Sequence, residues 1–175
     1  LREEMRSSIM LVPPLLVRFG VARIENDVKG CTLGVREIDP HVEVMERFGC
    51  TVERSREALI IRSEGLQANH HWLDYASVTT SENFVLCAAL AHGTSTLMNA
   101  ASEPHIQELC NFLNSLGANI QNIGSNTLQI QGVKGLHGGE YSIGPDYLEV
   151  VSFIGASVVT RGSIRIRNAG ANYLD

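Results

Sequence analysis

Apolar and polar positions along the chain follow one arrangement that occurs three times. In each copy an apolar stretch ends at a glycine, and a short segment with alternating character then leads to an asparagine. The glycine and asparagine pairs are Gly20 with Asn26, Gly93 with Asn99, and Gly162 with Asn168. Such a pattern predicts a helix closed by the glycine and then a strand. Recurrence at nearly equal spacing indicates one supersecondary unit used more than once.

The first copy predicts the order helix, strand, helix, strand, strand. The expected elements are a buried helix over 8–19, a strand over 21–25, a helix from Asp39 to Gly49, and strands over 51–55 and 58–63. A loop rich in glycine and charge, 26–40, precedes the second helix. Pro13 and Pro14 conflict with a regular helix over 8–19, so they predict a kink or a late helix start.

The second copy repeats this order, and a third copy begins near Tyr147. The expected elements are a helix over 82–92, a strand over 94–98, a helix from Ser102 to Gly117, strands over 118–122 and 127–131, and in the third copy a helix over 147–160 and a strand ending at Arg167. Asp39-Pro40-His41 and Glu103-Pro104-His105 occupy the same place in the first two copies. The glycines at 138–139 and 144 mark the expected hinge, which divides the chain into 1–144 and 145–175.

Composition narrows the classes of protein to which the chain can belong. Hydrophobic residues make up 44% and charged residues 19%, which is typical of a globular domain rather than a disordered tail. The formal charge of −5 argues against a nucleic-acid partner, and no apolar run reaches the length of a membrane span. The four cysteines lack paired metal-ligand spacing. Two of them lie in helical apolar patterns, which favours a reducing compartment such as the cytoplasm over a disulfide scaffold.

The loop around Cys31 is the most suggestive place for chemistry. Gly30 and Gly34 flank the cysteine, and Lys29 and Arg36 would favour its thiolate form and lower its pKa. That environment is typical of a reactive cysteine. A packing cysteine in an ordered turn explains the composition equally well.

Other candidate positions carry weaker signals. Arg6 precedes the first apolar helix, where a guanidinium and helix-end N–H groups could hold an anion, although a solvated Arg is the commoner case. The segment 77–81 fits either a helix N-cap or a phosphate-binding turn. Cys87 and Cys110 fall in apolar helical stripes and are expected in the core, and Cys50 receives no role. The six histidines suggest no metal site.

Several segments, in order along nearly the whole chain, resemble the family of UDP-N-acetylglucosamine enolpyruvyl transferases (1-carboxyvinyltransferases). The segments are 5–9, 15–20, 30–41, 74–78, 99–104, 138–141 and 145–149. The cysteine loop with its following Arg36 and Asp39 is the most specific of them. The resemblance implies an inside-out α/β barrel of the enolpyruvyl transferase type, built from repeated βαβαββ units. Residues 1–144 would be two units of the first of two similar domains, and 145–175 the hinge and the start of the second.

The resemblance also implies an activity. It is the transfer of the enolpyruvyl group from phosphoenolpyruvate to the 3-hydroxyl of UDP-N-acetylglucosamine, the first committed step of peptidoglycan precursor synthesis. Cys31 would donate a proton to the methylene carbon and would be the thiol that fosfomycin alkylates. No cofactor or metal is implied. The substrate-binding residues implied are Arg6, Arg36, Glu37, Ile38, Asp39, Pro40, Tyr75, Ala76, Ser77 and Val78.

The chain departs from the family in the segments expected to hold the nucleotide. Glu37-Ile38 replaces Pro-Val, Tyr75 replaces a Lys, Thr79 replaces a Gly and Tyr147 replaces an Arg. A Lys-Asn pair and a distant acid and Arg that complete the family site lie outside the chain, so we expect the chain alone to be inactive and to need the rest of a two-domain enzyme. Two alternatives stay open: an enolpyruvyl transferase for another acceptor, such as shikimate 3-phosphate or a nucleoside, and a noncatalytic module with the same fold.

Overall fold

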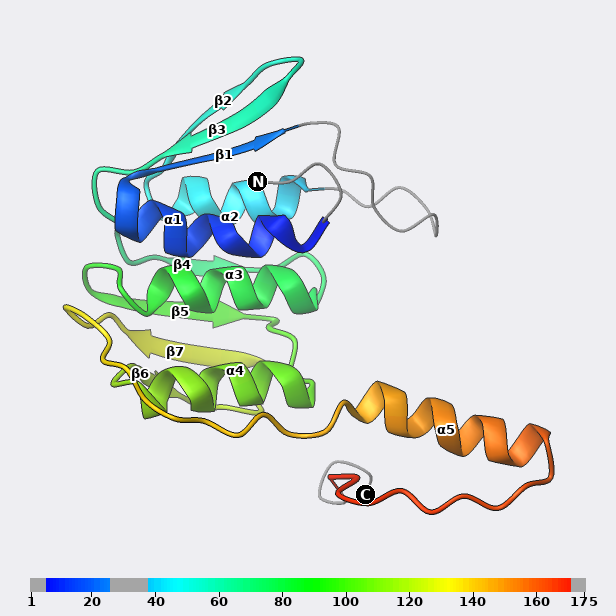
Figure 1. The fold of residues 1–175 in the computed structure, drawn as a ribbon. Helices are drawn as coiled ribbons and strands as arrows, with labels where there is room; N and C mark the ends of the chain where they lie inside the picture. The colour runs from blue at the N-terminus through cyan, green and yellow to red at the C-terminus, as the bar shows by residue number, and fades with distance from the viewer. Residues whose placement is uncertain (1–5, 26–37, 171–175) are drawn as a thin grey trace.

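Residues 6–25 and 38–170 are described by the structure, a computed structural model. The first half of the chain forms an antiparallel sheet of three strands in the order β1-β3-β2 (Figure 1). The strands are β1 (Val21–Glu25), β2 (Thr51–Arg54) and β3 (Ala58–Arg62). One face of this sheet is covered by a 3-10 helix and two α-helices: η1 (Arg6–Leu11), α1 (Val12–Phe19) and α2 (Asp39–Arg47).

The second half forms a sheet in the order β4-β5-β7-β6. Its elements are β4 (His70–Trp72), α3 (Val78–Ala88), β5 (Thr94–Met98), α4 (Pro104–Ser115), β6 (Asn119–Gln121) and β7 (Thr127–Gln131). The strands β4 and β5 are parallel and joined through α3, whereas β7 runs antiparallel to both β5 and β6. This half is therefore a complete βαβαββ unit, which confirms the repeat predicted from the sequence.

Helices form the inner layer and the sheets lie outside them. Helix α3 packs against α1, α2 and α4, and one apolar core runs through both units. Within it the rings of Phe48 and Phe84 lie 4.9 Å apart, which joins the end of α2 to the middle of α3. Alternation along β7 buries Leu128 and Ile130, while Gln129 between them is exposed. The described residues do not close into a barrel.

The prolines of the first helix act as the sequence predicts. Residues 6–11 form a 3-10 helix, and the α-helix starts only at Val12 with Pro13 and Pro14 in its first turn, where missing N–H groups cost no helical hydrogen bond. At its other end Gly20 adopts φ +69°, and its N–H donates to the carbonyl oxygen of Leu16. This left-handed cap turns the chain directly into β1.

The second unit differs from the sequence predictions at both ends of α3 and by an additional strand. Helix α3 begins at Val78 rather than at residue 82 and ends at Ala88 rather than at residue 92. The β-branched run 78–80 favours a strand by propensity, but the Ser77 cap and burial of the following turn outweigh that preference. Strand β4 is an addition to the five-element order that the sequence predicts for the repeat, because three residues are too few to show an alternating pattern.

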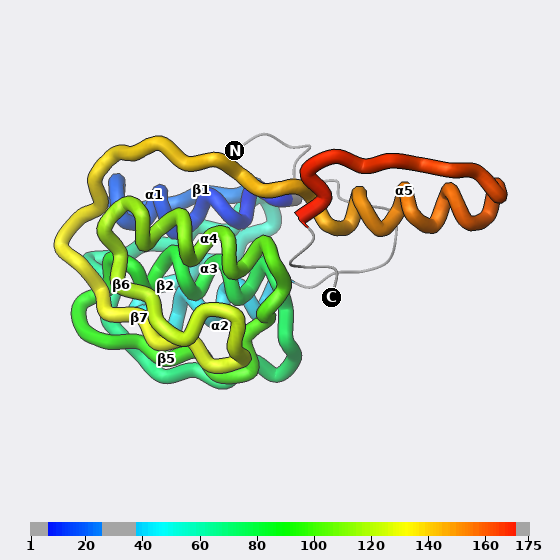
Figure 2. Tube along the Cα trace, turned by 90° about the horizontal axis from the view of Figure 1, so that it is seen from below, coloured from blue at the N-terminus to red at the C-terminus, as the bar shows by residue number. Residues whose placement is uncertain are grey.

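After β7 the chain crosses α4 as an extended strap, residues 132–146, and then forms α5 (Tyr147–Val159). Both views show α5 projecting away from the two sheets (Figures 1 and 2). Along α5 only Val150 is buried, whereas Val158 and Val159 are 70% and 81% exposed. The predicted strand ending at Arg167 does not form, because no described strand lies beside 163–167 to share its hydrogen bonds. The boundary between 144 and 145 stays a prediction.

Candidate functional site

The helices α1, α2, α3 and α4 all begin at one end of the molecule, where β1, β4 and β5 end (Figure 1). This follows from the repeat, since β1, β4 and β5 are each followed by a helix that runs back along the sheet. The first N–H groups of a helix have no intrahelical partner, and the helix dipole adds partial positive charge there. An end of the molecule with several helix starts is suited to binding anions.

Some of the expected ligand residues lie in the described part of the chain, and these are found together at this end of the molecule. Ile38 is the N-cap of α2, with Asp39 and Pro40 in its first turn. The exposed turn that holds Tyr75 and Ala76 leads into Ser77 and Val78 at the start of α3. Cys31, Arg36 and Glu37 lie outside the described residues. Arg6 begins η1, but its side chain is likewise outside the description.

A buried polar network that the sequence did not reveal joins these helix starts. The Nδ2 group of Asn83 donates to the Nδ1 atom of His41 at 2.9 Å and to the carbonyl oxygen of Ile9 at 3.4 Å. The Nε2 atom of His41 lies 3.4 Å from the Thr79 hydroxyl. The Asp39-Pro40-His41 motif drew attention to this helix start, but no local signal singled out Asn83.

Ser77 acts as the cap of α3. Its hydroxyl oxygen accepts hydrogen bonds from the Thr80 N–H at 3.4 Å and from the Thr80 hydroxyl at 2.9 Å. The Ser81 hydroxyl donates to the Ser77 carbonyl oxygen at 2.7 Å and accepts from the Ala101 N–H at 3.0 Å. The capping interpretation of 77–81 is therefore confirmed, and the start of α3 is tied to the turn that leads into α4.

Acidic groups also lie near this end of the molecule. Burial raises the pKa of Glu82, while the nearby His105 acts in the opposite direction. Glu103, the N-cap of α4, places its Oε2 atom in a buried position without a hydrogen-bond partner among the described residues. Asp39 forms an ion pair with Arg54 at the end of β2, which the sequence did not predict. The site is thus mixed in charge around the helix starts.

The three cysteines in the described residues are buried and free. Burial raises the pKa of Cys87 well above its ordinary value and that of Cys110 to about 12. The Cys50 pKa is also raised by burial, although a hydrogen bond with Ser63 opposes the change. The prediction that Cys87 and Cys110 are core residues is confirmed. Reactive thiol chemistry is disfavoured at all three positions.

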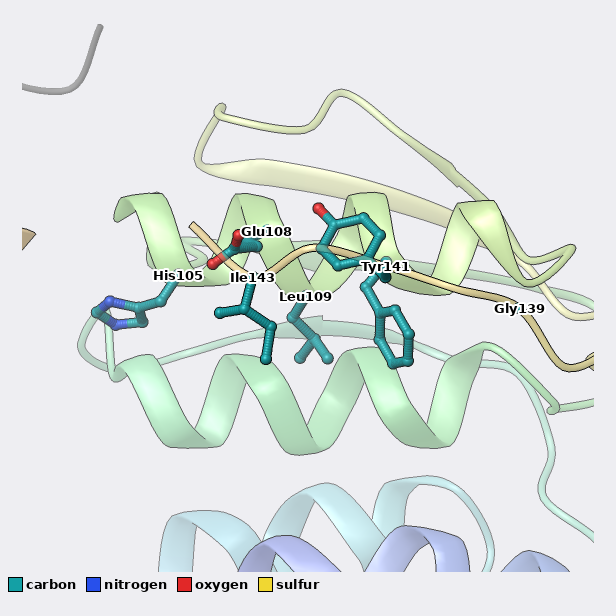
Figure 3. Close-up of a pocket in the computed structure, with 7 residues that line it drawn as sticks. His105, Glu108, Leu109, Gly139, Tyr141 and Ile143 are labelled. Carbon is teal, nitrogen blue, oxygen red and sulfur yellow. The ribbon is translucent and has the colours of Figure 1, made fainter. Parts of the chain in front are cut away.

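A pocket of about 360 Å³ lies between α4 and the strap that crosses it (Figure 3). Leu109 and Phe112 face Tyr141 and Ile143 across it, and the Phe112 and Tyr141 rings meet edge to face at 5.3 Å. The Gly144 N–H donates to the Glu108 carboxylate beside the pocket. None of the expected substrate-binding residues lines it, so we assign it no part in the site.

The described residues contain neither a metal-type cluster nor a membrane-spanning helix. Within 6–25 and 38–170, His, Cys, Asp and Glu side chains do not gather in a group of three that could hold a metal ion. Among the helices of the same residues, none combines the length and apolar character needed to span a membrane.

This arrangement, with helices inside and sheets outside, superposes on the solved structure of an enolpyruvyl transferase. The whole chain, residues 1–175, matches the family model of EPSP synthase (3-phosphoshikimate 1-carboxyvinyltransferase). The chain therefore belongs to this family, and the predicted fold class is confirmed.

Similar proteins include several UDP-N-acetylglucosamine 1-carboxyvinyltransferases. That of Treponema denticola is 45% identical over 166 residues, which cover 95% of this chain and 38% of that protein. That of Idiomarina loihiensis is 40% identical over 174 residues, which cover 99% of this chain and 41% of that protein. The chain thus spans about two fifths of the length of these curated relatives.

Solved structures agree with the fold. The enolpyruvyl transferase NikO from Streptomyces tendae superposes with a TM-score of 0.72 at 28% identity, over 87% of this chain and 36% of that chain. EPSP synthase from Acinetobacter baumannii has a TM-score of 0.65 at 16% identity, over 87% of this chain and 34% of that chain. The second likeness concerns the fold alone.

Proposed function

We propose that the full-length protein transfers the enolpyruvyl group of phosphoenolpyruvate to the 3-hydroxyl of UDP-N-acetylglucosamine, in the cytoplasm. The observation that carries this proposal is the 45% identity over 95% of the chain to a UDP-N-acetylglucosamine 1-carboxyvinyltransferase. The match spans nearly the whole chain rather than a single motif, so both repeat units take part in it.

The chemistry assigns separate tasks to the expected site residues. The sugar hydroxyl oxygen attacks the central carbon of phosphoenolpyruvate and gives its proton to a base in the remainder of the enzyme. Cys31 donates a proton to the methylene carbon in the same step, which gives a tetrahedral intermediate. Loss of a proton from the new methyl group and departure of phosphate then restore the double bond. Arg6 and Arg36 stabilise the anionic groups present before and during this step.

The nucleotide occupies the ends of two helices in this proposal. Ile38, Asp39 and Pro40, with Arg36 and Glu37 before them, contact the uridine from the start of α2. The turn 75–78 contacts it from the start of α3, where the Ser77 oxygen is already used as a helix cap. Backbone N–H groups at these starts, rather than the Ser77 hydroxyl, supply the donors for the diphosphate.

A second acceptor class has one observation in its favour. The chain has Tyr75 and Glu37 where the family resemblance leads us to expect Lys and Pro, so the nucleotide segments carry less positive charge. The likeness to the enolpyruvyl transferase NikO, at 28% identity, does not select an acceptor. An acceptor with fewer negative charges than a nucleoside diphosphate sugar fits these departures.

The experiment is an acceptor comparison on the full-length protein. Phosphate release from phosphoenolpyruvate is measured with UDP-N-acetylglucosamine, shikimate 3-phosphate and uridine, and each product is identified by mass. We expect turnover with UDP-N-acetylglucosamine and at least about a hundredfold lower kcat/KM with the other two. Cys31→Ala should lose turnover, with Cys50→Ala as the matched control. Turnover with another acceptor alone would select the second class, and none at all would favour a noncatalytic module.

A further inference from the structure

Asn83 is a fully buried amide in the apolar middle of α3. The residues that follow it, Phe84 and Val85, are also fully buried and belong to the hydrophobic core. Burying an amide costs free energy unless its polar groups are hydrogen-bonded. The Oδ1 atom of Asn83 has no partner within the described part of the chain, so the side chain is only partly compensated.

The bonds that Asn83 does make join three elements. Its Nδ2 group reaches the carbonyl oxygen of Ile9 in η1 and the Nδ1 atom of His41 in α2, while Asn83 itself belongs to α3. Each of these elements begins with expected ligand residues: Arg6 opens η1, Asp39 opens α2, and Ser77 caps α3. One side chain therefore sets the relative position of three helix starts.

The pairing also defines the roles of the His41 ring atoms. Because the Asn83 amide nitrogen serves two acceptors, Nδ1 of His41 accepts a hydrogen bond and carries no proton. The proton of the neutral ring is then on Nε2, which donates to the Thr79 hydroxyl. Since Thr79 lies in the first turn of α3, His41 provides a second link between the starts of α2 and α3.

We propose that Asn83 is a positioning residue for the nucleotide sugar. It holds η1 and the first turn of α2 against α3, so that the ligand residues on the three helix starts reach one substrate together. Asn83 does not touch the substrate in this proposal and acts through His41 and Ile9. The inference rests on the proposed function.

The test uses steady-state kinetics of the full-length protein with Asn83→Ala, His41→Leu and the double variant. The variants should displace the helix starts by a fraction of an ångström. We expect this to raise the KM for UDP-N-acetylglucosamine at least about tenfold and to leave kcat within about threefold of the wild type. Because both variants remove the same hydrogen bond, the double variant should lose no more than the worse single variant. His41→Asn, whose Oδ1 can take the place of Nδ1, should retain most of the affinity.

Asn114→Ala provides the matched control. Asn114 also makes two short hydrogen bonds, both with the backbone of Ile120 and both 2.9 Å long, but near the other end of α4. Its loss should lower the unfolding temperature and leave KM within about twofold. If Asn83→Ala does not fold, the two His41 variants test the same bond.

The outcomes separate the inference from the function on which it rests. An active wild-type protein whose Asn83→Ala variant is less stable but has an unchanged KM would show a purely structural role and overturn the inference alone. If the effects of the two single variants on KM add up in the double variant, the inference alone would also be overturned. A wild-type protein without transferase activity would overturn the proposed function together with the inference.

Discussion

The guanidinium of Arg54 at the end of β2 lies 2.7 Å from the carboxylate of Asp39, the first residue of α2. Both side chains are more than half exposed, so the pair contributes less than about 1 kcal/mol to stability. Its effect is local: it orients a carboxylate at a proposed nucleotide contact and offsets negative charge where a diphosphate would bind.

Removing this cation should affect binding more than stability. In the full-length protein, Arg54→Ala should raise the KM for UDP-N-acetylglucosamine by up to about fivefold while the free energy of unfolding changes by less than about 1 kcal/mol. Kinetics and denaturant unfolding measure the two effects. Arg47→Ala, which removes the ion pair with Glu43 in the last turn of the same helix, is the control and should leave KM unchanged. Equal effects of the two variants would contradict the local role.

The buried thiols predict a simple labelling pattern. With its pKa at about 12, Cys110 is a thiolate in only about one molecule in ten thousand at pH 8. Cys50 and Cys87 are buried with raised pKa values as well. Alkylation of the native protein followed by mass spectrometry should therefore modify Cys31 and spare the other three, whereas the unfolded chain should react at all four. Labelling of Cys87 in the native protein would contradict the burial of this side chain.

Gly132 leaves no room for a side chain. A Cβ atom at this position would lie 1.7 Å from the carbonyl oxygen of Ala91, and the Gly132 N–H donates to the carbonyl oxygen of Gly93 at 2.9 Å. Gly132→Ala must separate the end of β7 from the turn before β5, and we expect a loss of at least about 3 kcal/mol in chemical unfolding. Gly135→Ala, where no atom lies within 4 Å of the added carbon, should change stability by less than about 0.5 kcal/mol.

Stability should fall as the pH drops below about 6.5, in part because of His71. Burial lowers the pKa of this side chain, with the Glu43 carboxylate acting in the opposite direction. The unfolded chain then takes up the proton at a higher pH than the folded one, so protonation favours unfolding in this range. Urea unfolding at pH 7 and pH 5 should show a smaller difference for His71→Gln than for the wild type. His70→Gln, at the exposed neighbouring position, should keep the wild-type difference; equal changes in both variants would contradict this assignment.

Local signals in the sequence were enough to predict most of the secondary structure. Several signals act within a few residues, so they can be recognised without a fold. They are the glycine caps, the Asp39-Pro40 and Glu103-Pro104 helix starts, the apolar run in 58–63 and the alternation in 127–131. The repeat also determined the order of elements. The predictions failed where tertiary contacts decide: the start of α3 depends on burial of its first turn, and a strand at 163–167 needs a partner.

For the candidate site, the sequence determined which residue types are present and the family to which they point, because those signals are carried by contiguous motifs. Only the tertiary structure showed that the starts of η1, α2 and α3 meet and that Asn83, His41 and Arg54 link them. Ile9 and Asn83 are separated by about one full repeat, and a hydrogen bond between such positions leaves no trace in local spacing. It forms because the repeat packs its helices side by side, which no short segment encodes.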